Sequence, residues 1–356
     1  MNCCTKAVPK VTFLQGLYAT ALLATLPLFA FVPAAVAADE SCLRRSVLVM
    51  VLDSSGNPVT DLTAADIQAE FRGQPVTIHS AEFAVQPARV IVLLDASGSV
   101  MHRAGKWRFF RQTAENIGTT LPNEFSLGLV VFAAETLLQV STDNGREAFL
   151  AVLRDLPADR KGVPTYSKRT SIRDAIVEGV KLLEPVQRGD SLYLITDGGE
   201  NQSRAGRRDV EDRLLHSGVR LFVLVLRFDQ FEGLIDANEL VQQQQMRDLA
   251  TSSGGHAAFF PSRDFSNLGF GPTDKTYQLS EIESLVLETI LRKLYMPMVA
   301  SYRLELELPR LVDKPRKWKL QVVGSDGKVR KGLTVAFPGK LLPCVEPNSP
   351  VTATSP

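Results

Sequence analysis

The chain has 356 residues, enough for one large hydrophobic core and a smaller module. Hydrophobic residues make up 45% of it and charged residues 22%, proportions that are typical of a globular protein. The formal net charge is only +1, so bulk electrostatic attraction to nucleic acid is not indicated.

The first 37 residues have the pattern of a secretory signal peptide. Lys6 and Lys10 form a basic start, residues 14–31 are apolar, and residues 35–37 offer an A-x-A cleavage site. A retained membrane anchor is the alternative, because the apolar run is long for a signal peptide. Pro33 and the small residues near it favour cleavage. We therefore expect an exported protein, periplasmic or extracellular, with no stable membrane span.

Removal of this segment takes Cys3 and Cys4 with it and leaves Cys42 and Cys344 as the only cysteines. Two cysteines in an exported protein often pair. One of them precedes the first predicted strand and the other follows the last, which favours a disulfide. In the entropic account such a bridge contributes on the order of 5 kcal/mol, because it closes nearly the whole chain. Two unpaired thiols near the chain ends are the alternative.

Residues 38–87 are predicted to be an N-terminal β segment. Residues 46–52 are rich in β-branched side chains and predict a strand. Residues 54–58 predict a turn, and residues 62–71 begin with a short helix-like piece. Residues 75–83 predict a second strand.

Residues 88–296 alternate between strand and helix patterns. Strands are predicted at residues 89–94, 125–132, 191–196, 219–226 and 256–260, and helices at residues 106–121, 146–156, 170–183, 209–216, 238–252 and 279–295. This alternation predicts an α/β fold with a doubly wound, mostly parallel sheet covered by helices on both faces.

After Pro297 the hydrophobic pattern changes to a period of two, which is typical of antiparallel strands. A few strands cannot form a core alone. We therefore expect residues 297–338 to join the strands within residues 46–83 in a small antiparallel β module built from both chain ends. Residues 339–356 are rich in Pro, Ser and Thr and predict a disordered tail.

Residues 90–101, VIVLLDASGSVM, combine a buried strand with a polar ending. Asp95, Ser97 and Ser99 follow at every second position, so in extended backbone their side chains point the same way. They lie beyond the end of a strand, where open α/β sheets bind ligands. Such oxygen ligands suit Mg²⁺ or Mn²⁺ rather than Zn²⁺. A polar turn that only caps the next helix is the alternative.

Two later stretches favour the ligand site. Residues 191–201, SLYLITDGGEN, are a second apolar strand that ends in Asp197, and residues 168–176, KRTSIRDAI, place Thr170 at the head of a helix. The order of these motifs along the chain resembles that of the metal-ion-dependent adhesion site of von Willebrand factor type A (vWA) domains: D-x-S-x-S comes first, then a lone Thr and then T-D-G. The resemblance extends over roughly residues 45–338. The leader, VLDSSGNPVTDLTAADIQAEFRGQPVTI, resembles that of the VWFA-related proteins of Acidobacteria.

One feature of the loop departs from this resemblance. Family members usually have small glycines just before the Thr, whereas Lys168 and Arg169 stand there in this chain. Ser171 and Asp174 also fit a capping box, so the loop could serve only the start of the helix.

The resemblance implies a metal site and a mode of binding. Ser97, Ser99 and Thr170 would supply hydroxyl oxygens, and Asp95 and Asp197 would hold the ion directly or through water. We expect Mg²⁺, with Mn²⁺ and Ca²⁺ as alternatives. A carboxylate from a protein partner would fill the open position, which implies metal-dependent protein–protein interaction or adhesion. The sequence indicates neither the identity of the partner nor the oligomeric state.

Basic residues crowd the predicted rim of this site. They are Arg103, Lys106, Arg160, Lys161, Lys168, Arg169, Arg204, Arg207 and Arg208. Such a rim would attract an acidic ligand and raise its association rate. The alternative is ordinary solvated loop charge, diluted by nearby acids that include Glu200 and Asp209.

An enzyme needs a different set of residues. The sequence contains no H-E-x-x-H, no G-x-S-x-G and no Walker A loop. A metal-dependent phosphohydrolase built on the same Mg²⁺ site is the enzyme alternative, but Ser97 stands where a second carboxylate would be expected. We therefore predict a protein that is not an enzyme.

Overall fold

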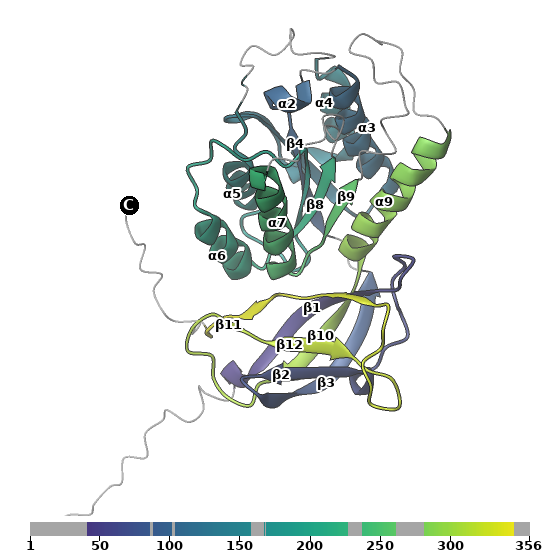
Figure 1. Cartoon of the computed structure of the whole chain (residues 1–356), viewed down its shortest axis with the longest axis vertical. Helices are drawn as coiled ribbons and strands as arrows, with labels where there is room; N and C mark the ends of the chain where they lie inside the picture. The colour runs from purple at the N-terminus through teal and green to yellow at the C-terminus, as the bar shows by residue number, and fades with distance from the viewer. Residues whose placement is uncertain are drawn as a thin grey trace, which may run out of the picture.

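Two six-stranded sheets, one above the other in Figure 1, organise the molecule. The computed structural model describes residues 41–85, 88–101, 104–157, 167, 169–226, 237–260 and 281–344. The predicted signal peptide, residues 1–37, lies outside these ranges. Of the helices within them, none has the length and apolar character needed to cross a membrane.

The upper sheet has the strand order β6-β5-β4-β7-β8-β9. Its strands are β4 (Arg89–Asp95), β5 (Ser126–Phe132), β6 (Thr136–Val140), β7 (Ser191–Thr196), β8 (Arg220–Leu226) and β9 (Ala257–Phe260). All neighbouring pairs are parallel except β5 and β6. The predicted doubly wound, mostly parallel sheet is therefore confirmed, with β6 as an antiparallel edge strand that the sequence reading missed.

Helices cover both faces of this sheet (Figure 1). One face carries α3 (Ala104–Thr120), α4 (Gly145–Asp155) and α9 (Glu281–Val299), and the other carries α5 (Ile172–Leu182), α6 (Arg207–Ser217) and α7 (Ala237–Ser252). In β4, Val92 and Leu94 belong to the first core, whereas Ile91 and Leu93 belong to the second. Alternate side chains of a strand point to opposite faces, which explains why this strand is apolar at every position from Val90 to Leu94.

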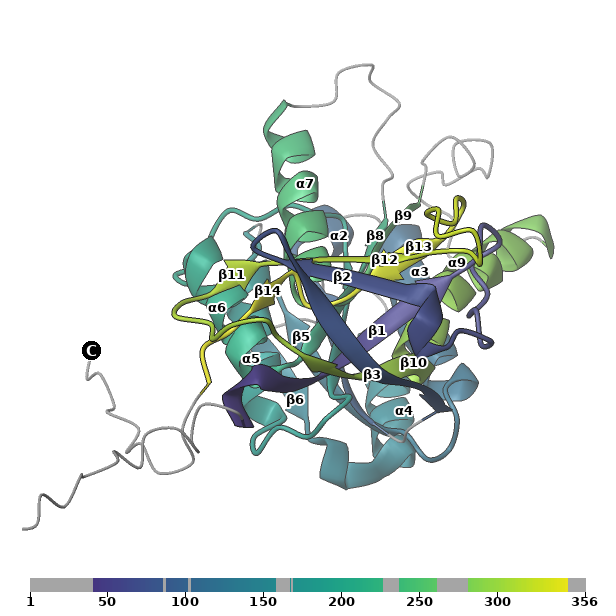
Figure 2. The ribbon, with the colours of Figure 1, turned by 90° about the horizontal axis from the view of Figure 1, so that it is seen from below.

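The lower sheet is antiparallel and has the strand order β12-β2-β3-β10-β1-β13. Its strands are β1 (Arg44–Leu52), β2 (Ile67–Phe71), β3 (Gln74–Val85), β10 (Ala300–Glu307), β12 (Lys319–Val322) and β13 (Thr334–Ala336). Segments that are distant in sequence therefore lie side by side, as the view from below in Figure 2 shows. Buried side chains such as Phe71, Tyr302 and Trp318 form a separate hydrophobic core with the strands of this sheet. A 3-10 helix at Ala64–Asp66 matches the predicted helix-like piece.

Several contacts join the two sheets. Arg220, at the start of β8, donates to the carbonyl oxygens of Pro297 (3.2 Å) and Met298 (3.1 Å), where α9 leads into β10. Lys340 forms an ion pair with Glu211 of α6 at 2.8 Å. The Arg220 contacts lie at the edge of the parallel sheet where its strands begin.

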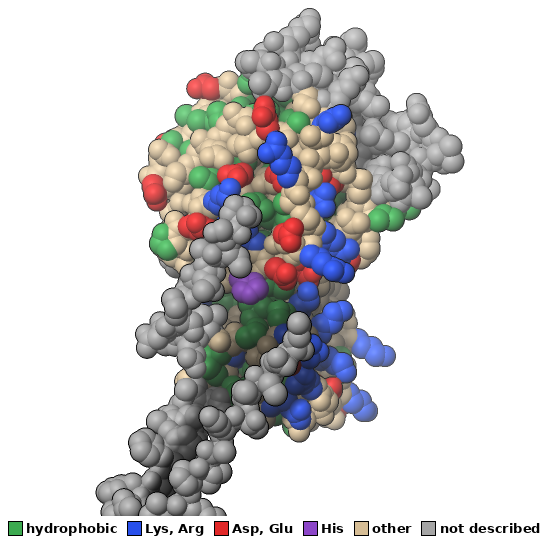
Figure 3. Space-filling model, turned by 90° about the vertical axis from the view of Figure 1, so that its left-hand side faces the viewer, with side chains coloured by type: hydrophobic (Ala, Val, Ile, Leu, Met, Phe, Trp, Pro, Cys, Tyr) green, Lys and Arg blue, Asp and Glu red, His purple; other side chains and the backbone are tan. Residues whose placement is uncertain are grey.

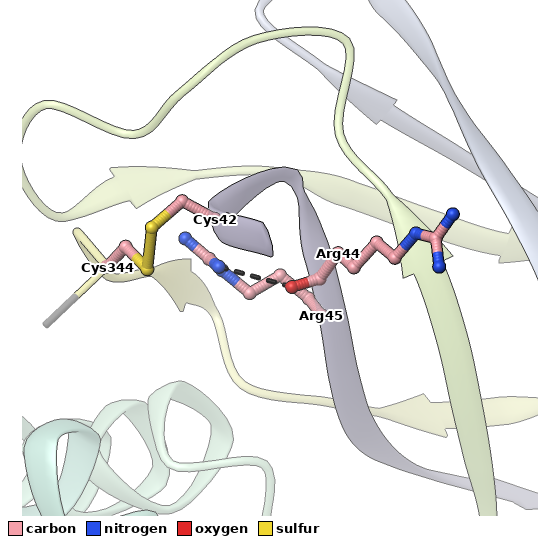
Figure 4. Close-up of a disulfide and its surroundings, with 4 residues drawn as sticks. All are labelled: Cys42, Arg44, Arg45 and Cys344. Atoms are coloured by element: carbon pink, nitrogen blue, oxygen red, sulfur yellow. Dashed lines mark hydrogen bonds between the residues drawn. A yellow bond between two sulfur atoms is a disulfide. The ribbon is translucent and has the colours of Figure 1, made fainter. Parts of the chain in front are cut away.

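The prediction that residues 339–356 form a disordered tail is wrong for the first of these residues. Lys340–Leu341 form β14, which pairs with β11 (Arg316–Lys317), because main-chain hydrogen bonds and the ion pair to Glu211 hold this segment. Cys344 forms a disulfide with Cys42, so the disulfide that the sequence favours is present (Figure 4). In the same view, Arg45 donates from Nη1 to the carbonyl of Arg44. Residues 345–356 lie outside the described ranges.

Candidate metal centre

The candidate site lies where the winding of the parallel sheet reverses. From β4 the chain first adds β5 and β6 on one side, and it then returns to add β7, β8 and β9 on the other. Ligands of open α/β sheets bind beyond the carboxyl ends of the strands at such a reversal. Asp95 is the last residue of β4 and Thr196 is the last residue of β7. The Thr196 hydroxyl donates to Asp95 Oδ2 at 2.7 Å, so the two strand ends are joined there.

The D-x-S-x-S loop gathers its three oxygen-bearing side chains, as the sequence predicts. Asp95 Oδ1 accepts the Ser97 N–H at 2.8 Å, and the hydroxyls of Ser97 and Ser99 are 3.2 Å apart. Asp95 and Ser97 are fully buried, whereas Ser99 is exposed. The short helix α2 (Gly98–Met101) starts here, because the carbonyl of Ser97 accepts the N–H groups of Val100 and Met101. The loop thus reaches from the core to solvent.

Asp197 joins this group from the loop after β7. Its carboxylate lies 2.8 Å from Lys106 Nζ, and its interaction with the nearby Ser99 hydroxyl helps to lower its pKa. Asp197 and the D-x-S-x-S residues, which are about a hundred positions apart in the chain, therefore form one cluster.

The two carboxyl groups are electrostatically different. Burial, together with the nearby charge of Asp197, raises the pKa of Asp95 to about 7. Burial opposes the ionisation of Asp197 too, but the ammonium of Lys106 outweighs it and holds the pKa of Asp197 below its ordinary value. The positive charge of Lys106 therefore compensates the charge of one of the two buried carboxyl groups, that of Asp197. The second carboxyl group, that of Asp95, favours an additional cation.

Thr170 lies at the same end of the sheet. Its N–H donates to the Asn201 side chain at 2.9 Å, and its carbonyl accepts the N–H groups of Asn201 and Gln202 in the loop that follows Asp197. The next residue, Ser171, donates from its N–H to the carbonyl of Ala133, just after β5. The main chain of Thr170 is thus fixed between the end of β5 and the Asp197 loop.

The capping box considered for this loop is wrong. The Ser171 hydroxyl donates to the carbonyl of Ala134, and the Asp174 carboxylate accepts the N–H groups of Arg204 and Ala205. The start of α5 is capped instead by Glu200 and Ser203, whose side chains both accept the N–H of Arg173 at 3.0 Å. The helix start and the Asp197 loop are therefore locked together.

The expectation of a basic rim is wrong for Lys106. Helix α3 begins at Ala104, so Lys106 falls on its inner side, where the side chain is only 2% exposed. The sequence also suggests Glu200 as a surface acid, but this residue is buried. Its carboxylate accepts hydrogen bonds from N–H groups of the Asp197 loop. Arg169 and Arg207 are exposed but interact with Gln202 and Asp248. Arg103, Arg160, Lys161 and Lys168 lie outside the described residues.

Exposed basic side chains gather elsewhere, over the antiparallel sheet (Figure 3). The C-terminal strands and their loops carry several of them, namely Lys314, Lys317, Lys319, Lys328, Arg330 and Lys331.

The donor set fits a divalent cation. Asp95, Ser97, Ser99 and Asp197 offer two carboxylates and two hydroxyls, all of them oxygen ligands of the kind that Mg²⁺ takes. Within the described ranges, no three Asp, Glu, His or Cys side chains gather into a metal-binding group, so an all-carboxylate cage is not what this part of the chain provides. The buried Lys106 beside Asp197 is a feature that the sequence reading did not foresee.

The chain belongs to the von Willebrand factor type A domain family, whose model matches residues 90–271. Domains of this family often bind a divalent metal ion and take part in protein interactions. The matched residues include all five predicted metal ligands.

Several solved structures are distantly similar to this chain. The chain is similar to BatB from Bacteroides thetaiotaomicron, with 15% identity and a TM-score of 0.39 over 58% of this chain and 98% of that one. An aerotolerance-related membrane protein from Bacteroides fragilis matches with 17% identity and a TM-score of 0.37 over 51% of this chain and 94% of that one. Proximal thread matrix protein 1 from the mussel byssus, described with a zinc-occupied MIDAS motif, matches with 16% identity and a TM-score of 0.40 over 64% of this chain and 50% of that one. No curated protein matches.

Proposed function

We propose that this is an exported, non-enzymatic vWA-domain protein that binds a protein partner through a divalent cation. The observation that carries this proposal is the convergence of Asp95, Ser97, Ser99 and Asp197 where the sheet winding reverses. Thr170, held at the same edge by the Asp197 loop, is proposed as the fifth ligand. Mg²⁺ is the ion we expect, with Mn²⁺ and Ca²⁺ as alternatives.

The residues explain how such a site would recognise an acidic partner. When bound, the cation supplies a positive centre that a carboxylate can approach. The serine and threonine hydroxyls hold it without cancelling its charge, and burial of Asp95 keeps bulk water from screening that charge. Ser99 is exposed, so the site opens to solvent on the side where a partner would arrive.

The domain arrangement is part of the proposal. Residues 1–37 would be a cleaved signal peptide, and residues 88–296 would form the vWA domain with its adhesion site. Residues 38–87 and 297–338 would form a separate β module, supported by the pairing of β10 with both β1 and β3.

The direct test is cation uptake, measured by titration calorimetry with Mg²⁺ and Mn²⁺. We expect one ion per chain for the wild type and at least about tenfold weaker binding for Asp197→Ala, because a charged ligand is lost. Asp212→Ala, an exposed position of α6, is the matched control and should bind like the wild type. A pull-down from the source organism's extract should lose its captured protein in EDTA and with Asp197→Ala.

Two outcomes would contradict the proposal. No uptake of either ion would leave the domain as a scaffold with an unused site. Turnover of a generic phosphate ester that needs Mg²⁺ and is lost in Asp95→Ala would support the phosphohydrolase alternative instead.

A further inference from the structure

We propose that Lys106 is a built-in competitor of the divalent cation, so that the site binds its ion strongly only together with an anionic ligand. This inference rests on the proposed metal site and adds a means by which the chain regulates it.

The position of Lys106 is the first support. Its Nζ lies 2.8 Å from Asp197 Oδ2, and the two side chains are only 2% and 10% exposed. The Ser99 hydroxyl lies close enough to Asp197 to help lower the pKa of its carboxyl group, so the lysine contacts the cluster that would hold the ion. Lysine is almost never fully buried unless it is paired, and here a proposed metal ligand is among the groups that pair with it.

The neighbouring residues fix the lysine in this place. Trp107 and Phe110, close to it on α3, are buried in the core, and Trp107 donates from Nε1 to the carbonyl of Pro157 at 2.7 Å. The helix therefore cannot easily rotate to carry the ammonium away, and any movement has to come from the lysine side chain itself.

An ammonium in this position opposes cation binding in two ways. It occupies an oxygen of Asp197 that a metal ion would use, and it repels a second positive charge that enters the same poorly screened space. The ion must either displace the ammonium or bind beside it, and both lower its affinity.

The balance of charge gives the lysine a second effect. The charges of a divalent ion, of Lys106 and of two ionised aspartates add up to one net positive charge. The ion and the two aspartates without the lysine are neutral. A carboxylate from a partner removes that excess. Because coupling between two ligands is reciprocal, the ion and the acidic ligand each strengthen the binding of the other.

The experiment measures the Mn²⁺ dissociation constant by calorimetry and by electron paramagnetic resonance, with and without an excess of acetate as the carboxylate probe. Lys106→Met and Lys106→Gln remove the charge, Lys106→Arg keeps it, and Lys181→Met is a control lysine paired with Glu178 on α5. Thermal melts establish that each variant is folded, and Lys106→Gln retains a hydrogen-bond donor for Asp197 if Lys106→Met does not fold.

We expect both neutral variants to bind Mn²⁺ at least about tenfold more tightly than the wild type, because the repulsion is removed. Lys106→Arg and Lys181→Met should stay close to the wild type. Acetate should tighten Mn²⁺ binding in the wild type by more than in the neutral variants. Equal affinities for wild type and neutral variants would overturn the role of Lys106 and leave the metal site standing, whereas absence of uptake in every variant would overturn both.

Discussion

Asp95 is the residue at which function and stability conflict. It is fully buried, it lies close to a second carboxylate, and its hydrogen-bond donors are the Ser97 N–H and the Thr196 hydroxyl. These two donors do not offset the cost of an ionised carboxyl there, since its pKa is raised to about 7. A position selected for folding alone would not carry this group, whereas a cation site requires it.

The raised pKa predicts a pH dependence of the metal-free protein. Between about pH 4 and pH 7 the folded chain keeps a proton on Asp95 that the unfolded chain has lost, so this contribution to stability disappears as the pH rises. Asp95→Asn should therefore raise the free energy of unfolding at pH 8 by about 1–3 kcal/mol and change it little at pH 4. Urea denaturation in EDTA measures this.

A matched variant separates Asp95 from its neighbour. Asp197→Asn should be destabilising at the same pH, because it removes the carboxylate that pairs with the buried ammonium of Lys106. A wild type that is more stable at pH 8 than Asp95→Asn would contradict the prediction.

At the scale of elements, the loop from Asp197 to Gly206 organises the site. Glu200 accepts the N–H groups of Arg173, Gln202 and Ser203, and Gln202 in turn donates to the carbonyl of Thr170. One buried carboxylate thus fixes the start of α5 and the loop that carries Asp197. We infer that Glu200 positions two ligands without being one.

Removal of that carboxylate should therefore affect folding and binding together. Glu200→Ala removes the acceptor of the Ser203 N–H and one of the two acceptors of the Arg173 and Gln202 N–H groups, so it should lower the free energy of unfolding by about 1–3 kcal/mol. The Mn²⁺ dissociation constant should rise, because the main chain at Thr170 and Asp197 is less well fixed. Calorimetry and urea denaturation measure the two effects. Glu178→Ala, a partly exposed position of α5, is the control, and equal behaviour of the two variants would refute the role of Glu200.

The elements also show what the sequence can predict. The central residues of strands β4 and β7 are apolar because both faces of the sheet are covered, and D-x-S-x-S has a period of two, so the strands and the candidate ligands could be predicted from the sequence. Strand β6 is half-buried at the sheet edge and has no clear period. Glu200 and Lys106 gave no signal, because a charge predicts a surface position until a partner distant in sequence is known.

At the scale of the whole molecule, the candidate binding site and the stabilising disulfide belong to different sheets. The parallel sheet carries the candidate site at the carboxyl ends of its strands, while the antiparallel sheet contacts the opposite side (Figure 1). The disulfide lies beside the antiparallel sheet, between Cys42 just before β1 and Cys344 just after β14. It links the segment that precedes β1 directly to the segment that follows β14.

Loss of this bridge should therefore weaken folding and leave the ion site intact. The disulfide spans a sequence separation of 302 residues, and in the entropic account a loop of this length contributes about 5 kcal/mol of stability. The double variant Cys42→Ser, Cys344→Ser should have a free energy of unfolding that is lower by about 3–5 kcal/mol. This range lies at or below the entropic value because measured effects are often smaller than that value. The Mn²⁺ dissociation constant should stay within about twofold of the wild type, since no ligand moves. Dithiothreitol should reproduce the loss in the wild type and have no further effect on the double variant. A change in Mn²⁺ affinity that accompanies the loss of stability would show that the antiparallel sheet helps to shape the metal site.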